Sequence, residues 1–263
     1  MLRIFVLGIT QSLAEFLPVS SSAHLVLLPL FCGWEDQGML TDVALHVGTL
    51  FSVVLYFRKD VAALTRGAFS LLKGRTGEAD ARFLLLLIVA TLPVLAVGFF
   101  AGGVVDAYLR SPRLIACTMS VFGVALYFAD RYGPKKLTVG EMTFGRALFV
   151  GAAQVLAIVP GVSRSGITVT AARLAGVKRE DAARFSMLLS IPTIGAAGGY
   201  GLLRFLSDPS VAEEGRLVLF GMFVSFAGGL AAVWFLMNWV KKASFAVFAV
   251  YRILLGAVLF YLF

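Results

Sequence analysis

Charge is scarce in this sequence, and so are cysteine and histidine. Only 14% of the 263 residues are Asp, Glu, Lys or Arg, whereas a soluble domain carries about 25%. With 59% hydrophobic residues and a mean hydropathy of +0.90, the chain is not an ordinary soluble domain. The two cysteines, Cys32 and Cys117, lack the spacing of a disulfide framework or a metal site, so we interpret them as packing residues.

The sequence contains long segments without any charged side chain. Residues 83–105 and 217–240 contain no charged side chain, and each exceeds the roughly 20 residues that a spanning helix needs. Their apolar residues do not alternate with polar ones as in an outer-membrane barrel, and backbone groups in lipid must be satisfied within their own segment. The sequence therefore predicts an all-α integral membrane protein, with residues 1–263 forming a single membrane domain.

Two polar stretches, residues 8–22 and 151–165, echo each other 143 residues apart. Gly, Gln, Leu and Ala coincide in them, and a proline and a pair of serines follow in both. The apolar segments that come next, 22–32 and 166–176, are too short to cross a bilayer. Broken polar segments in corresponding halves are typical of an inverted-topology repeat. We predict one re-entrant helix hairpin in each repeat, with repeat one at about 1–130 and repeat two at about 144–263.

Six further apolar segments complete the predicted topology, three after each hairpin. They are residues 38–57, 83–104, 112–129, 184–206, 217–240 and 244–263. Because three spans per repeat is an odd number, the second repeat is inverted relative to the first.

The basic residues fit this arrangement. Of the 23 Lys and Arg residues, 16 lie in the predicted loops 58–82, 130–146, 173–184 and 241–242. Cytoplasmic loops are rich in Lys and Arg, so both termini are expected outside. The net charge of +8 thus reflects membrane orientation, and we expect no nucleic-acid partner.

The first hairpin gathers groups suited to nucleophilic chemistry. Gln11 and Glu15 are four residues apart and share a helix face. Pro18 ends that helix, and three serines open the next half-helix: Ser20, Ser21 and Ser22. His24 follows Ser21 by three residues, so an imidazole lies near a hydroxyl and could take its proton. The alternative is that the serines only cap the helix and that His24 is a core residue.

The second hairpin places Arg164 in an apolar run. A charge there costs about 3 kcal/mol or more unless it is paired. Arg164 opens a half-helix, whose N-terminus attracts anions, and a guanidinium forms forked contacts with phosphate oxygens. Its neighbours are small or hydroxylated, and we expect them to help bind the anion: Ser163, Ser165 and Gly166. An ion pair between Arg164 and Glu15 is the alternative, and it is compatible with phosphate binding.

Together the hairpins predict two half-helix N-termini that meet near the middle of the membrane around a phosphate or diphosphate group with a lipid tail. Glu15 and Gln11 would hold a divalent cation, Mg²⁺ or Ca²⁺, against that group. Other intramembrane polar residues are given structural roles. Asp42 and His46, four residues apart, could pair with each other, with a direct part in catalysis as the alternative, and Arg252 could snorkel or pair structurally.

These motifs resemble the undecaprenyl-diphosphatase family of bacterial inner membranes, of the bacitracin-resistance type. The similarity lies in residues 11–25 and 160–166, and it extends to 45–49 and 183–192. The resemblance implies hydrolysis of undecaprenyl diphosphate to undecaprenyl phosphate and inorganic phosphate, which recycles the lipid carrier for peptidoglycan synthesis. It also implies a multi-pass protein of the inner membrane with an active site that opens to the periplasmic side.

Residue by residue, the family's serine and threonine positions fall on Ser21 and Ser22, its histidine on His24 and its arginine on Arg164. We favour Ser21 as the nucleophile and His24 as the base. Many members have Glu where this chain has Gln11, so a cation would rest more on Glu15. A transporter of a lipid phosphate is the competing function, and the chain could act alone or as a homodimer.

Overall fold

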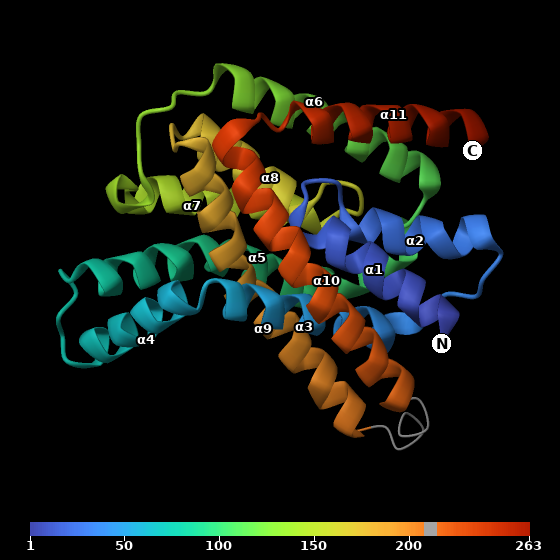
Figure 1. Cartoon of the computed structure of the whole chain (residues 1–263), viewed down its shortest axis with the longest axis horizontal. Coiled ribbons are helices and arrows are strands. Elements are labelled where there is room, and N and C mark those ends of the chain that lie inside the picture. The colour runs from blue at the N-terminus through green and yellow to red at the C-terminus, as the bar shows by residue number, and fades with distance from the viewer. Residues whose placement is uncertain (208–214) are drawn as a thin grey trace.

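The computed structural model describes residues 1–207 and 215–263, and it describes their side chains except at 39, 99, 101–108 and 200–207. Every regular element in these ranges is a helix, which confirms the predicted all-α class (Figure 1). The elements are α1 (Leu2–Phe16), α2 (Ser21–Cys32), α3 (Gly38–Tyr56), α4 (Arg58–Leu72), α5 (Ala79–Tyr108), α6 (Pro112–Tyr132), η1 (Val139–Glu141), α7 (Phe144–Val155), η2 (Leu156–Ile158), α8 (Arg164–Leu174), α9 (Arg179–Ser207), α10 (Gly215–Lys242) and α11 (Ala246–Leu262).

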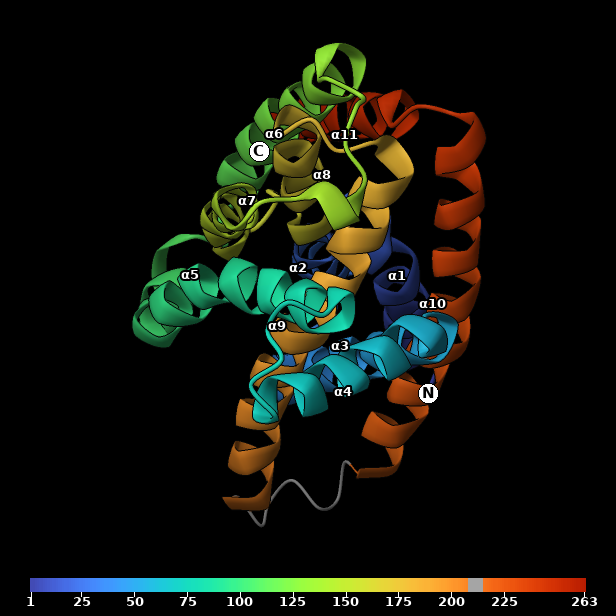
Figure 2. The ribbon, with the colours of Figure 1, turned by 90° about the vertical axis from the view of Figure 1, so that its left-hand side faces the viewer.

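The two polar stretches become two broken helix pairs. Residues 17–20 separate α1 from α2, and residues 159–163 separate η2 from α8. Pro18 and Pro160 lie in these breaks, where the missing N–H of proline stops the preceding helix. Figure 2 shows α1 and α2 in the interior of the molecule, between α5 on one side and α10 on the other. The first break therefore lies in the interior of the molecule.

The packing of the helices repeats between the two halves. The first helix of one half packs against a long helix of the other: α1 on α10 and α7 on α5. Both contacts use the repeated glycine. A Cβ on Gly8 would lie 2.8 Å from Val224, and a Cβ on Gly151 would lie 2.4 Å from the carbonyl oxygen of Ala90. Such approaches leave no room for a side chain, so glycine at these positions seats each broken pair against its neighbour.

Three helices in the described residues are long and apolar enough to cross a membrane: Ala79–Gly98, Pro112–Tyr132 and Gly215–Lys242. The pair α3 and α4 would add a fourth if it formed one span, although it bends by 87°. The structure thus supports a multi-pass membrane protein. The last predicted segment, 244–263, becomes the 17-residue apolar helix α11, which packs along α6.

Two details differ from the sequence prediction. The predicted loop 58–82 contains the helix α4, because its apolar residues recur at helical spacing and Gly67 lets it approach the backbone of Asp80, within 2.4 Å of the added Cβ. Cys32 and Cys117 are free, as expected, but both are exposed on the protein surface. The interpretation of both cysteines as packing residues is therefore wrong, and apolar surface of this kind suits contact with lipid.

Candidate active site

The residue that immediately precedes each second half-helix has a positive φ angle, which is unusual for a residue other than glycine. Ser20, before α2, has φ +76°, and Ser163, before α8, has φ +71°. They are the two residues other than glycine with positive φ in the described ranges. Their hydroxyls repeat a contact as well, since Ser20 lies 3.3 Å from Ser22 and Ser163 lies 3.2 Å from Ser165. Backbone strain of about 1–3 kcal/mol at such a residue is tolerated where surrounding structure fixes it, often at a functional site.

The two half-helix N-termini differ in their capping. The Ser163 hydroxyl accepts a hydrogen bond from the N–H of Gly166 at 3.1 Å, so α8 is capped by its own chain. Ser20 makes no side-chain capping bond to α2. First-turn N–H groups without a capping side chain, at the positive end of the helix dipole, form an anion-binding site. The N-terminus of α2 is therefore the better candidate for a direct phosphate contact.

Arg252 of α11 joins the two breaks. It is fully buried, and its Nη2 donates to the carbonyl oxygens of Gly161 and Val162, both at 2.8 Å. Its Nη1 donates to Pro18 O at 3.4 Å and its Nε to Met119 O at 3.2 Å. Arg252 thus does not snorkel, and it pairs with no carboxylate among the described side chains. It is held by backbone carbonyls from both hairpins, which fixes one break against the other.

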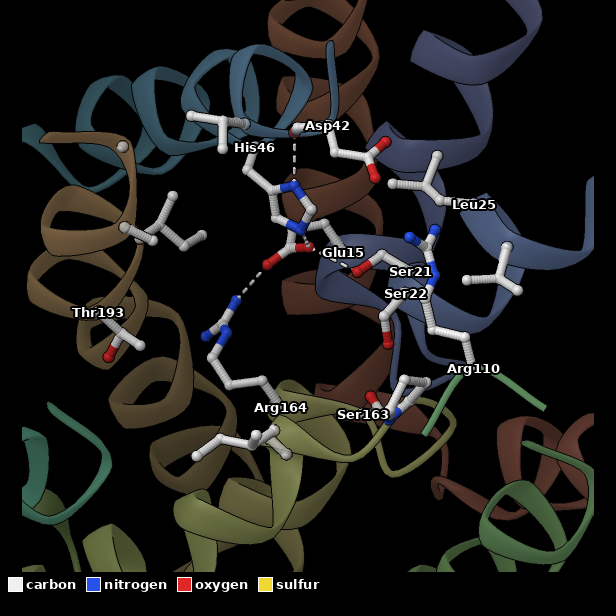
Figure 3. Close-up of a pocket in the computed structure, with 18 of the residues that line it drawn as sticks. Glu15, Ser21, Ser22, Leu25, Asp42, His46, Arg110, Ser163, Arg164 and Thr193 are labelled. Atoms are coloured by element: carbon white, nitrogen blue, oxygen red, sulfur yellow. Dashed lines mark hydrogen bonds and ion pairs between the residues drawn. The ribbon is translucent and has the colours of Figure 1, made fainter. Parts of the chain in front are cut away.

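A cavity of about 580 Å³ lies where the two breaks meet. Its polar lining includes Glu15, Ser21, Ser22, Ser163 and Arg164, which the sequence predicted to converge. Figure 3 shows Arg164 and Ser21 approaching Glu15 from different sides, from α8 and α2. The rest of the wall is largely apolar, with residues of α2, α3, η2 and α9: Leu25, Val26, Val43, Ala157, Ile158, Ile194, Ala197 and Gly198.

Glu15 is the centre of the polar contacts. Its Oε1 accepts from Nη2 of Arg164 at 2.8 Å, so the ion pair across the repeats is formed. Its Oε2 accepts from the Ser21 hydroxyl at 2.7 Å and from Nε2 of Gln11 at 3.0 Å. Arg164 is further held by the carbonyl oxygen of Ser186 at 3.2 Å. A serine hydroxyl that donates to a buried carboxylate has a general base already in place.

His24 does not join this group. Its Nδ1 lies 2.8 Å from the carbonyl oxygen of Ser20, and its Nε2 lies 2.6 Å from the Tyr251 hydroxyl. The ring stacks on Tyr251, and His24 is not among the residues that line the cavity. The predicted pairing of Ser21 with His24 is therefore not formed. Three residues along a helix place the two side chains on one turn, but each turns to a different partner.

His46 is the histidine that lines the cavity. Its Nε2 lies 3.4 Å from Glu15 Oε2, and its Nδ1 contacts the backbone oxygen of Asp42 at 2.7 Å. The Asp42 carboxylate accepts from Gln37 instead, so the predicted pair of Asp42 and His46 forms through the Asp42 backbone and not through its side chain. Sequence reasoning preferred structural roles for His46 and Arg252 over a part in the site. Their one signal was an ionisable residue inside an apolar segment.

The contacts of Glu15 and Gln11 do not fit a cation held between them. Gln11 turns its amide N–H toward Glu15, and its buried Oε1 has no hydrogen-bond partner. Both oxygens of Glu15 already accept from other side chains. No group of three or more His, Cys, Asp or Glu residues suited to a metal is found among the described residues. Mg²⁺ and Ca²⁺ need several oxygen ligands, which these two side chains do not present together.

The fold and the cavity define a class of protein. It is a multi-pass helical membrane protein with a hydroxyl, a carboxylate and an arginine in one pocket, as an enzyme of phosphate chemistry requires. The chain belongs to the Bacitracin resistance protein BacA family, whose model matches residues 4–258.

Curated relatives are similar over nearly their whole length, and the following are named undecaprenyl-diphosphatase. The protein from Desulforudis audaxviator is 47% identical over 255 residues, which are 95% of this chain and 93% of the relative. The protein from Dinoroseobacter shibae is 44% identical over 263 residues, 98% of this chain and 96% of the relative. The protein from Saccharophagus degradans is 45% identical over 254 residues, 97% and 95%.

Proposed function

We propose that this protein hydrolyses undecaprenyl diphosphate to undecaprenyl phosphate and inorganic phosphate. The contact between the Ser21 hydroxyl and Glu15 Oε2, at 2.7 Å and within reach of Arg164, is the observation that supports hydrolysis most directly. The family and the names of the relatives give the substrate. A transporter of a lipid phosphate needs no activated hydroxyl, and the relatives' names give that alternative no support.

Ser21 is proposed as the nucleophile, with Glu15 in place of His24 as the group that accepts its proton. Arg164 and the first-turn N–H groups of α2 would stabilise the negative charge on the phosphate under attack. The hydroxyls of Ser22 and Ser163, which line the cavity, would shape the phosphate site, whereas Ser20, Ser165 and Gly166 lie outside the cavity lining and would support them through their hydrogen bonds. This set keeps Ser22 and Ser163 of the predicted binding residues in the cavity and changes the identity of the base.

The proposed topology has six spans and two re-entrant hairpins, and places the protein in the bacterial inner membrane. Both termini lie at one end of the molecule with the connection between α2 and α3, and α4 lies at the other end (Figure 1). The cavity lining includes Asp36 from that connection and Gly38 at the start of α3. If the basic end around α4 faces the cytoplasm, the cavity opens toward the periplasm, and the apolar wall can receive the first isoprene units of the tail.

We further propose that Mg²⁺ or Ca²⁺ reaches the pocket on the diphosphate itself, because Glu15 and Gln11 do not present a ligand set of their own. A bound cation would neutralise charge on the phosphate oxygens. The protein's part in that case is to bind the remaining oxygens through Arg164 and the α2 N-terminus.

The experiment that tests the function uses purified protein in detergent with undecaprenyl diphosphate and Mg²⁺. We expect one inorganic phosphate per lipid and undecaprenyl phosphate as the other product, with the monophosphate lipid left intact as a control substrate. Release of no phosphate from the diphosphate would contradict the proposal, and so would release from both lipids at equal rates.

A further inference from the structure

The contact between His46 Nε2 and the Glu15 carboxylate requires a proton between the two groups. A backbone carbonyl only accepts hydrogen bonds, so the 2.7 Å contact with Asp42 O places a proton on His46 Nδ1. In the neutral ring, Nε2 then carries a lone pair. That atom lies 3.4 Å from Glu15 Oε2, which also carries lone pairs when ionised. Two acceptors at this distance attract each other only when a proton lies between them.

The same carboxylate oxygen also contacts the nucleophile. Glu15 Oε2 accepts from Ser21 Oγ at 2.7 Å and faces His46 Nε2 at 3.4 Å, so one oxygen joins the hydroxyl to the imidazole. Arg164 holds the other oxygen at 2.8 Å and stabilises the ionised form of Glu15. Because the ionised form of Glu15 is favoured, a proton that Glu15 takes from Ser21 is expected to pass to another acceptor. Gln11 contacts Oε2 as well, but it does so through its N–H group, and an amide side chain does not take up the serine proton.

We propose that His46 is the group that finally accepts the serine proton, a role that rests on the hydrolytic function proposed above. In the first step, Ser21 Oγ forms a bond to the terminal phosphorus, and the bond from that phosphorus to the bridging oxygen breaks. The bridging oxygen leaves with its electron pair on the lipid monophosphate. The Ser21 proton passes through Glu15 Oε2 to His46 Nε2, which becomes an imidazolium beside an ionised carboxylate.

In the second step, water attacks the phosphorus of the phosphoserine. Its oxygen and one proton stay on the inorganic phosphate, its other proton returns to Ser21 Oγ, and the bond between Oγ and phosphorus breaks. His46 then releases its proton to water, which it can reach because its side chain is 31% exposed and lines the cavity. The sum of the steps is one water consumed and one phosphate released.

The other charged groups around His46 come from several elements. Glu15 of α1 and Arg164 of α8 lie in its immediate surroundings, and Asp42 precedes it by one turn of α3. Asp36 and Arg110, which pair at 2.9 Å, lie at the same cavity. The described lining residues of α2, η2 and α9 carry no charge. Of these groups, Glu15 is the one whose carboxylate faces His46 Nε2.

The test compares the chain's two histidines in the phosphate-release assay across pH. His46→Gln can still donate to Glu15 but cannot accept a proton, so kcat should fall about 10²-fold while KM stays within about threefold. The fall in kcat on the acid side of the pH profile should disappear. His24→Gln should keep the acid-side fall in kcat, whatever the overall activity of that variant. An unchanged kcat and pH profile in His46→Gln would overturn the proposal, while an inactive wild type would instead overturn the function.

A second proton acceptor at residue 11 provides the rescue. Gln11 Nε2 already lies 3.0 Å from Glu15 Oε2, so Gln11→Glu places a carboxylate beside the same oxygen. The double variant Gln11→Glu with His46→Gln should regain at least about tenfold of the lost kcat, which repair of packing alone would not do. If His46→Gln does not fold, ¹⁵N resonances of the two wild-type histidine rings replace it. The His46 ring must then titrate with the acid-side fall in kcat, and a ring that does not do so refutes the role.

Discussion

Replacing Arg252 with methionine tests whether the two hairpins act as one site. Methionine is apolar and of similar length, so the change removes the guanidinium and leaves the surrounding helices packed. The two 2.8 Å bonds to Gly161 O and Val162 O disappear, with the weaker ones to Pro18 O and Met119 O. Each buried carbonyl left without a donor costs about 1–3 kcal/mol, so the two short bonds represent about 2–6 kcal/mol.

Part of that cost is offset, because the folded wild type keeps a desolvated charge that has no acidic partner among the described side chains. We therefore expect Arg252→Met to lower the unfolding free energy by about 1–4 kcal/mol. We expect the effect on kcat to be larger than the effect on stability. The carbonyls of Pro18 and Gly161 belong to the breaks that position Ser21 and Arg164, and a displacement of about 1 Å at a reacting group can cost about 10²-fold in rate. We expect kcat to fall by about that factor.

The assay is phosphate release from undecaprenyl diphosphate, with thermal unfolding in the same detergent. Arg113→Met is the matched control, since Arg113 also donates to a backbone oxygen, that of Phe263 at 2.6 Å, but lies outside the cavity. Its turnover should equal that of the wild type. Arg252→Lys keeps the positive charge but loses the several N–H donors of the guanidinium, so its turnover should lie between those of Arg252→Met and Arg113→Met. Turnover of a folded Arg252→Met within about threefold of wild type would refute the positioning role.

Two further predictions concern the carboxylate and the hydroxyls. Without substrate, calorimetric titration of the wild type with Mg²⁺ should show no tight site, because both oxygens of Glu15 accept from other side chains and Gln11 turns its amide N–H toward one of them; tight binding by the substrate-free wild type would contradict this. Ser21→Ala should lower phosphate release about 10³-fold or more, while Ser22→Ala, whose hydroxyl contacts Ser20 rather than Glu15, should lower it at most about tenfold. Equal losses would show that Ser21 is not the nucleophile.

The broken hairpins could be read from the sequence because their physical signal is strong. Charge and hydroxyls are costly in an apolar segment, and proline stops a helix wherever it falls. The convergence of Glu15, Ser21 and Arg164 follows from these two facts and the repeat. The repeated strain at Ser20 and Ser163 was not predictable, since serine gives no local preference for positive φ.

The choice between the two histidines lay beyond sequence reasoning. Spacing placed His24 near Ser21, but a side chain turns to the partner that satisfies it best, and Tyr251 comes from the far end of the chain. Arg252 illustrates the same limit, because its partners are backbone carbonyls and every residue has one. Contacts that depend on rotamers and on carbonyl groups leave no pattern in the order of residues.

Phosphate release by Arg164 variants tests most directly whether α2 and α8 bind one head group between them. Arg164→Ala removes the only contribution of α8 to the charge in the cavity, and we expect kcat to fall by about 10² or more, with Arg164→Lys partly active because it keeps the charge without the fork. Undiminished release by a folded Arg164→Ala protein would mean that the phosphate is held elsewhere, and the meeting of the two hairpins would then have no catalytic meaning.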